Sequence, residues 1–216
     1  MQPLPRLDPN EEGNTHLYTL LRKINPDDVQ IFVEKLTTQP LDTRFHTYRE
    51  LLIGAHLCEH GLQVRYEHQI DSKTPDWSLL NIEGFPKEVI DVFTLHQRRD
   101  KDIEITTSLK QHNSYAGWIT VPPEHVYRKL SDKAGQYSVL TEQYDIPFVL
   151  ALFVDFKASV EQEEVRHVLF DLHGGWFKTS PHISGLVYSR IRNFQFEFRF
   201  FSNPYAMRKS ALESQV

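Results

Sequence analysis

Two aspartates in the first half of the chain have the type and spacing needed to bind a divalent metal ion. Asp76 follows Pro75 at the start of an apolar segment, and Asp91 lies fifteen residues later, between Ile90 and Val92. Burying a carboxylate in an apolar strand is costly unless a cation or several hydrogen-bond donors compensate its charge. Carboxylate oxygens are also the ligands that Mg²⁺ prefers, with water and phosphate completing its coordination.

Glu50 is a third acid that the predicted elements bring to the same place. If the strands around Asp76 and Asp91 pair as a hairpin across the turn at 83–86, both aspartates lie near one end of the sheet. Glu50, on the preceding helix, could then pack above them. A structural alternative stays open, in which Asp76 caps a turn, Asp91 pairs with a lysine or arginine, and Glu50 is solvated.

The elements that must position these acids are predicted from the spacing of apolar residues. Such residues recur at intervals of three and four from Tyr48 to Leu57, and Gly61 ends the run, which predicts a helix over 43–60. Alternating or apolar segments predict strands over 62–67, 76–82 and 88–95. Residues 97–122 are polar, and we expect an irregular excursion from the core there.

The second half predicts a helix, a buried strand and a hairpin. Two prolines open a helix predicted over 123–144, which leads to an apolar strand over 147–155. A strand, a crossover helix and a strand in this order favour a partly parallel sheet. A short helix over 161–170 and two strands over 185–191 and 194–201 follow. Phenylalanines alternate with polar residues from 194 to 200, which predicts that one face of the last strand is core.

Composition excludes several classes of protein. The 216 residues, 40% of them apolar, fit one globular domain with extensions, and the single Cys58 excludes an intramolecular disulfide framework and fits a reducing compartment. The longest apolar run, 146–154, is too short to span a membrane, and the first residues lack the features of a secretory signal. We therefore expect a cytoplasmic protein without a membrane partner. Its net charge of −5 means that any nucleic acid must bind at a local basic patch.

Short motifs in this order resemble the PD-(D/E)XK nuclease superfamily. The motifs lie at 44–51, which contains Glu50, and at 57–61, 74–77 and 90–95, while 129–137, 146–152 and 203–206 are similar to later segments of a bacterial branch. The resemblance spans 42–208, which leaves 1–41 as a leader and helical extension and 209–216 as a polar tail. It implies a restriction-endonuclease-like α/β fold, with a mixed central sheet flanked by helices. It also implies hydrolysis of phosphodiester bonds, in DNA, with Mg²⁺ or Mn²⁺.

The resemblance gives each acid a role. It implies that Asp76 and Asp91 hold the metal and that Glu50 supports the metal or its water. Glu88 is the alternative to Asp91 as second acid. We prefer Asp91 because it lies deeper in the apolar segment, while Glu88 follows the strand start, where we expect solvent to be near.

The lysine that the family carries two residues after the second acid is missing here. Its place is taken by Phe93 if Asp91 is the acid, or by Ile90 if Glu88 is. We therefore expect Lys133, on the predicted helix 123–144, to supply the positive charge at the scissile phosphate. Further residues predicted to bind substrate on this helix are Lys129, Gln136 and Tyr137. The alternative for the two lysines is a solvated helix face.

A basic cluster offers a further contact with nucleic acid. Arg98, Arg99 and Lys101 could grip the phosphate backbone, which positions a substrate without reading its sequence. The missing lysine also supports a second hypothesis, a catalytically impaired nuclease-fold module that binds nucleic acid or a protein partner. Whether the chain forms a homodimer is left open.

Overall fold

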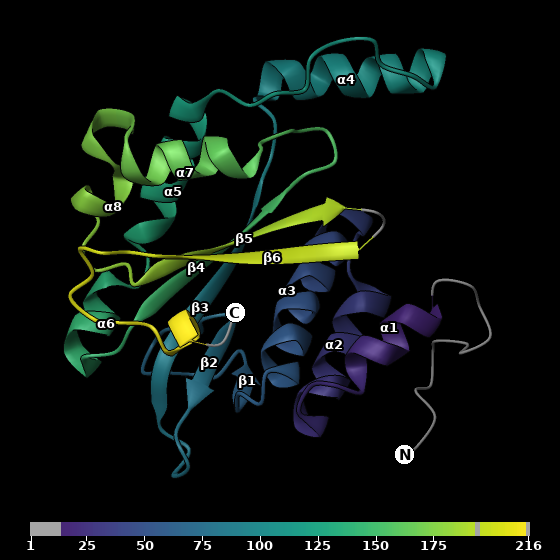
Figure 1. The fold of residues 1–216 in the computed structure, drawn as a ribbon. Coiled ribbons are helices and arrows are strands. Elements are labelled where there is room, and N and C mark those ends of the chain that lie inside the picture. The colour runs from purple at the N-terminus through teal and green to yellow at the C-terminus, as the bar shows by residue number, and fades with distance from the viewer. Residues whose placement is uncertain (1–13, 193–194, 215–216) are drawn as a thin grey trace. The chain divides into compact units, whose positions relative to one another are not determined.

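The structure is a computed structural model that describes residues 14–192 and 195–214 (Figure 1). The chain divides into two compact units, residues 1–92 and 93–216. Each unit combines helices with strands, and both antiparallel and parallel strand pairs occur, which confirms the predicted mixed α/β class. In the described part of the chain, no helix combines the length and apolar character needed to cross a membrane.

The first unit contains three helices followed by antiparallel strands. In the strands, Tyr66 pairs with Trp77, and Trp77 pairs in turn with Ile90. The first two helices fall within 1–41, the segment expected to be a leader and helical extension, and they lie beside the third (Figure 1). The elements are α1 (Asn14–Leu21), α2 (Pro26–Thr38), α3 (Leu41–Glu59), β1 (Val64–Tyr66), β2 (Trp77–Leu80) and β3 (Pro86–Leu95), the last of which ends in the second unit.

Trp77 forms the centre of the core of the first unit. Its side chain is fully buried, and its ring lies 5.8 Å from that of Phe32 and 5.2 Å from that of Tyr66. Gly54 on α3 gives the indole its space, since a Cβ at that position would meet the ring at 1.9 Å. The indole Nε1–H also donates a hydrogen bond of 2.8 Å to the carbonyl oxygen of Glu50. These contacts fix α3 against β2.

The second unit contains the predicted strands and more helices than predicted. β4 runs parallel to β5, so the sheet is partly parallel, as predicted, and β5 forms the predicted antiparallel hairpin with β6. Helices α5 and α7 lie side by side (Figure 1). The elements are α4 (Arg99–His112), α5 (Pro123–Ala134), α6 (Ser138–Tyr144), β4 (Phe148–Val154), α7 (Gln162–Phe170), η1 (Leu172–Gly174), α8 (Trp176–Thr179), β5 (Gly185–Arg192), β6 (Gln195–Ser202) and η2 (Ala211–Ser214).

The prediction of an irregular segment over 97–122 was wrong, because this segment contains α4. Ile105 is the residue of this helix that is buried, so the sequence shows no apolar stripe. Acidic residues in its first turn and basic residues in its last turn complement the helix dipole. Asn113 ends the helix in a left-handed conformation.

The prediction of one helix over 123–144 was also wrong, because the chain breaks it into α5 and α6. The break falls at 135–137, between the Gly135 that caps α5 and the Tyr137 that precedes α6. Tyr137 is buried, and its ring packs edge-on against Phe148 at 5.2 Å. The helix therefore breaks where Tyr137 packs against Phe148, although the spacing of apolar residues continues through this point.

The phenylalanines of β6 pack against the neighbouring strands. The rings of Phe196 and Phe198 are partly buried and meet Phe153 of β4 edge-on, at 5.9 Å and 6.2 Å. Phe194 lies outside the described residues. The described rings therefore serve packing, as the alternation predicts.

His56 on α3 provides a test of stability against pH. Burial, with the nearby charge of His60 as a smaller cause, lowers the pKa of His56 to about 4, whereas an unfolded histidine has a pKa of about 6.5. Between these values the unfolded chain binds more protons, so stability falls as the pH falls from 6.5 to 4. We expect His56 to contribute about 1–2 kcal/mol to this loss of stability. This is less than the free energy that the full change in pKa would give, because the side chain is partly exposed to solvent.

The variant His56→Leu cannot titrate and should lose that part of the pH dependence. Urea unfolding of parent and variant at several pH values between 4 and 7 measures it. Equal slopes of unfolding free energy against pH in the two proteins would contradict the assignment.

Candidate metal centre

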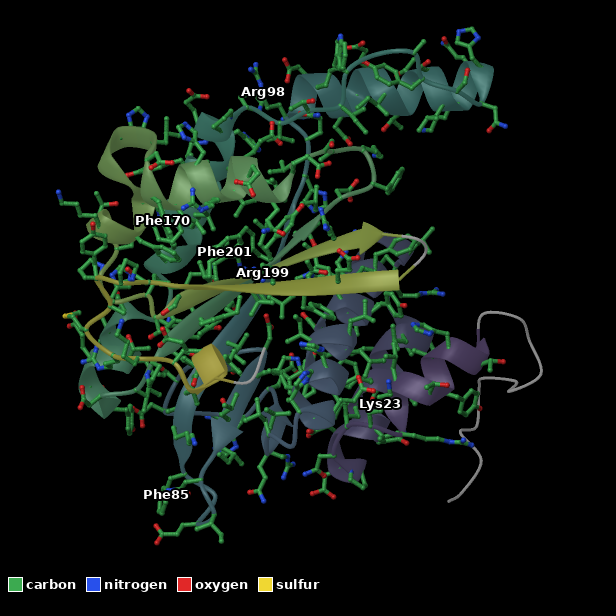
Figure 2. The ribbon with its side chains drawn as sticks, in the orientation of Figure 1. Lys23, Phe85, Arg98, Phe170, Arg199 and Phe201 are labelled. Atoms are coloured by element: carbon green, nitrogen blue, oxygen red, sulfur yellow. The ribbon has the colours of Figure 1, made fainter. Side chains whose placement is uncertain are left out.

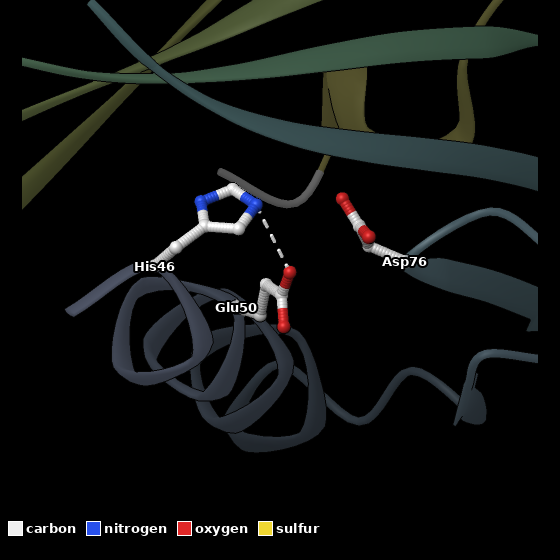
Figure 3. A group of neighbouring side chains, drawn as sticks. All are labelled: His46, Glu50 and Asp76. Atoms are coloured by element: carbon white, nitrogen blue, oxygen red, sulfur yellow. Dashed lines mark ion pairs between the residues drawn. The ribbon is translucent and has the colours of Figure 1, made fainter. Parts of the chain in front are cut away.

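Helix α3 places His46 and Glu50 on one face, because side chains four residues apart on a helix are neighbours. His46 Nε2 lies 3.1 Å from Glu50 Oε1 (Figure 3). The main-chain carbonyl of Glu50 accepts the hydrogen bond from Trp77, so the core holds this turn of the helix in place. His46 is half-exposed and Glu50 is buried, which gives the pair one dry side and one side open to solvent.

Asp76 completes the group from the segment just before β2. One ligand atom from each of His46, Glu50 and Asp76 lies within 4.8 Å of the others, and Figure 3 shows the three side chains converging. Asp76 Oδ2 accepts a hydrogen bond of 2.6 Å from the main-chain N–H of Val92, so β3 orients the carboxylate. Two carboxylates and an imidazole at this spacing can hold a divalent metal ion.

Glu50 is held in its charged form. Burial by itself raises the pKa of its carboxyl group. The hydrogen bonds from His46 and Tyr66, with the positive charge of Lys35, outweigh burial and bring the pKa below its ordinary value. Glu50 therefore presents an ionised carboxylate, the form that binds a metal ion.

Tyr66 and Lys35 support Glu50 from the side away from His46. The Tyr66 hydroxyl donates to Glu50 Oε2, and Lys35 Nζ donates in turn to the Tyr66 oxygen at 2.9 Å. Lys35 Nζ also lies 2.5 Å from Glu67 Oε1 and 4.8 Å from the centre of the Tyr66 ring. Burial, followed by the charge of Glu50, raises the pKa of Tyr66, so its hydroxyl keeps its proton.

Asp91 and Glu88 are both buried in β3. Asp91 lies between Ile90, whose strand partner is Trp77, and Val92, whose N–H binds Asp76. It is nevertheless outside the group of three ligands found in the described part of the chain, so its role in holding a metal stays a prediction. Glu88 is also buried, contrary to our expectation, because β3 begins at Pro86 and places Glu88 inside the sheet opposite Leu79.

The residues predicted on the helix 123–144 belong to the second unit. Lys133, on α5, donates a hydrogen bond of 3.2 Å to Gln136 Oε1, and Lys129 is exposed on the same helix. Tyr137 is buried and serves packing. Since the ligand group lies in the first unit, the substrate roles of these residues stay predictions.

The basic cluster lies at the start of α4. Arg98 precedes the first residue of the helix (Figure 2) and pairs with Asp100 at 3.2 Å, while Lys101 pairs with Glu104 at 3.0 Å. Arg99 is exposed beside them. Exposed ion pairs are weak, so a phosphate could displace either acid. Their contact with nucleic acid stays a prediction.

His46 was missed from the sequence although a signal for it exists. The predicted helix 43–60 contains both His46 and Glu50, and their spacing of four residues places them on one face. A histidine at that distance from a candidate ligand is itself a candidate. Lys35 and Tyr66 have no comparable signal, because only the tertiary structure brings them to Glu50.

The fold and the site together define an α/β protein whose first unit carries side chains able to hold a divalent metal ion. No protein-family model and no curated protein matches the sequence. A solved structure, a CdiA-CT/CdiI toxin and immunity complex from Burkholderia pseudomallei, is similar over 76% of this chain and 90% of that chain, with 11% sequence identity and a TM-score of 0.39. This degree of likeness carries no inference about activity.

Proposed function

We propose that this protein is a metal-dependent phosphodiesterase that acts on nucleic acid, DNA in the first place. The observation that carries the proposal is the convergence of His46, Glu50 and Asp76, whose ligand atoms lie within 4.8 Å of one another. Two of these three residues, Glu50 and Asp76, are acids to which the motif resemblance assigns this chemistry. Asp91 is proposed as a further acid of the site, beside Asp76 on the neighbouring strand.

The donor set favours a particular kind of ion. Carboxylates alone suit Mg²⁺, whereas an imidazole nitrogen suits transition metals better. With His46 beside Glu50 and Asp76, we propose that Mn²⁺ binds more tightly than Mg²⁺. A bound ion would lower the pKa of a water molecule and neutralise charge on the phosphate.

The chain's own residues define what happens around that ion. Glu50, ionised and buried, would hold it on the dry side of the site, and Asp76, partly exposed, on the side where a phosphate enters. His46 would bind through its Nε2 nitrogen, which faces Glu50. Lys133 is proposed to supply the positive charge at the scissile phosphate, and the basic residues at the start of α4 are proposed to contact the phosphate backbone.

A second candidate function is a module that binds nucleic acid, or a protein partner, without cutting. The observation that favours it is Phe93, which takes the place of the motif lysine two residues after Asp91 and is only 5% exposed. A buried phenyl ring cannot stabilise a phosphate charge. Cleavage would then depend on a cation from elsewhere in the chain.

Cleavage assays on supercoiled and linear DNA separate the two candidates. We expect nicking or cutting with Mn²⁺, weaker cleavage with Mg²⁺, and none with EDTA. If no metal supports cleavage but the protein retards DNA in a gel, the binding module is the better description. If the protein neither cuts nor retards DNA, both proposals are wrong for DNA.

A further inference from the structure

We propose that Lys35 and Tyr66 are positioning residues of the metal centre, so that helix α2 is part of the site. This inference rests on the proposed function, because it gives Lys35 and Tyr66 the role of orienting Glu50, a proposed metal ligand. The predicted domain begins at residue 42, and Lys35 lies before it, on the helical extension. The extension would then contribute to metal binding and would be more than a leader.

The hydrogen bonds among these residues have a defined direction. A lysine ammonium can only donate, so the Tyr66 oxygen is the acceptor of the bond from Lys35. The hydroxyl of Tyr66 therefore has its single proton free for Glu50, and it donates that proton to Oε2. The order Lys35 to Tyr66 to Glu50 follows from donor chemistry.

This order fixes the rotation of the Glu50 carboxylate. Tyr66 binds Oε2, while Oε1 faces His46 Nε2 at 3.1 Å. Oε2 is thus engaged by Tyr66, and Oε1 by His46, which is itself one of the three proposed ligands. Partners that orient a ligand in this way commonly change metal affinity by about 10- to 100-fold when they are removed.

Tyr66 is itself held rigidly, which makes it suitable for this role. Its side chain is 3% exposed, and its ring lies 4.1 Å from that of Phe32 on α2 and 5.2 Å from that of Trp77 on β2. Lys35 is held by Glu67 as well as by the Tyr66 oxygen and ring. The ammonium therefore has a fixed place beside the Tyr66 hydroxyl.

The test measures binding of Mn²⁺ alone to the full chain by isothermal titration calorimetry. We expect Lys35→Met and Tyr66→Phe each to weaken Mn²⁺ binding about 10- to 100-fold. Lys35→Arg should recover most of the affinity, because the guanidinium can still donate to the Tyr66 oxygen. The double variant should bind Mn²⁺ less weakly than the product of the two single losses predicts, because Lys35 acts largely through Tyr66.

Lys23→Met is the matched control. Lys23 also lies before residue 42 and also pairs with an acid, Glu59 of α3, at 2.6 Å, and Figure 2 labels it on the first unit. Its removal takes away a similar ion pair at Glu59, the last residue of α3, and we expect Mn²⁺ affinity to change less than about twofold. Thermal unfolding of each variant checks that the protein is folded at the temperature of the Mn²⁺ titration.

Two results would overturn the inference while leaving the metal centre intact. One is parent-like Mn²⁺ affinity in Lys35→Met together with a large loss in Asp76→Asn. The other is an additive effect of Lys35→Met and Tyr66→Phe, which would mean that Lys35 does not act through Tyr66. If Asp76→Asn binds Mn²⁺ as tightly as the parent, the metal centre itself is misplaced, and the inference fails with it. Lys35 is partly exposed, so Lys35→Met should fold even if Tyr66→Phe does not.

Discussion

Asp76→Asn should reduce metal-dependent DNA cleavage by at least about 100-fold, which corresponds to about 2.7 kcal/mol of lost transition-state stabilisation. Asparagine has nearly the same shape as aspartate, but it lacks the negative charge that attracts a divalent metal ion. Its amide oxygen can still accept the N–H of Val92, so the backbone of β3 keeps its partner. The fold should survive while the chemistry is lost. Initial rates of plasmid nicking at saturating Mn²⁺ measure the effect.

Asp71→Asn is the matched control for this variant. Asp71 is an exposed aspartate before β2, five residues from Asp76, and it has a positive φ of 53° that asparagine also tolerates. We expect its cleavage rate to stay within about twofold of the parent, because Asp71 is outside the ligand group and solvent and salt screen an exposed charge. Cleavage by Asp76→Asn at the parent rate, in protein purified free of other nucleases, would exclude Asp76 as a ligand.

Trp77→Ala should lower the free energy of unfolding by about 4 kcal/mol, the cost typical of deleting a fully buried tryptophan. The side chain is 0% exposed and fills the space beside Gly54, so its removal leaves a cavity between α3 and β2. The carbonyl of Glu50 also loses its hydrogen bond. Urea unfolding followed by circular dichroism measures the loss.

Trp118→Ala is the natural comparison, because Trp118 is 87% exposed. We expect this variant to change the unfolding free energy by less than about 0.5 kcal/mol. Trp77→Phe adds a finer test, since it keeps an aromatic ring but leaves the Glu50 carbonyl without its donor. If Trp77→Ala and Trp118→Ala are equally stable, the described core of the first unit is wrong.

The elements with strong apolar periodicity could be predicted from the sequence. The helix now seen at Leu41–Glu59 and the strand at Phe148–Val154 each bury many apolar side chains, and their spacing shows it. Helix α4 could not be found in this way, because Ile105 is the residue that it buries. The break between α5 and α6 depends on Tyr137 reaching Phe148, a contact that local pattern does not reveal.

The candidate site could be predicted in part for a similar reason. Asp76 stood out at the start of an apolar segment and Glu50 on the helix predicted before it, and the structure brings both to one group with His46. The cost of burying a carboxylate pointed to Asp91, which lies outside that group in the described part of the chain. The support of Glu50 could not be predicted, since Lys35 and Tyr66 are 31 residues apart in the sequence. No local periodicity relates positions at that distance.

The position of His46 and Glu50 on successive turns of α3 connects metal occupancy to local opening of that helix. Pro40, at the N-cap position, has no side-chain acceptor for the free amides of the first turn, which therefore lacks that stabilisation. An ion bound to both side chains would tie two turns together, and at 100 times its dissociation constant it would favour the closed helix by about 2.7 kcal/mol. Amide hydrogens near His46 would then exchange more slowly with solvent as the ion binds. Opening of this end of α3 and release of the ion would then be coupled, because each process would favour the other.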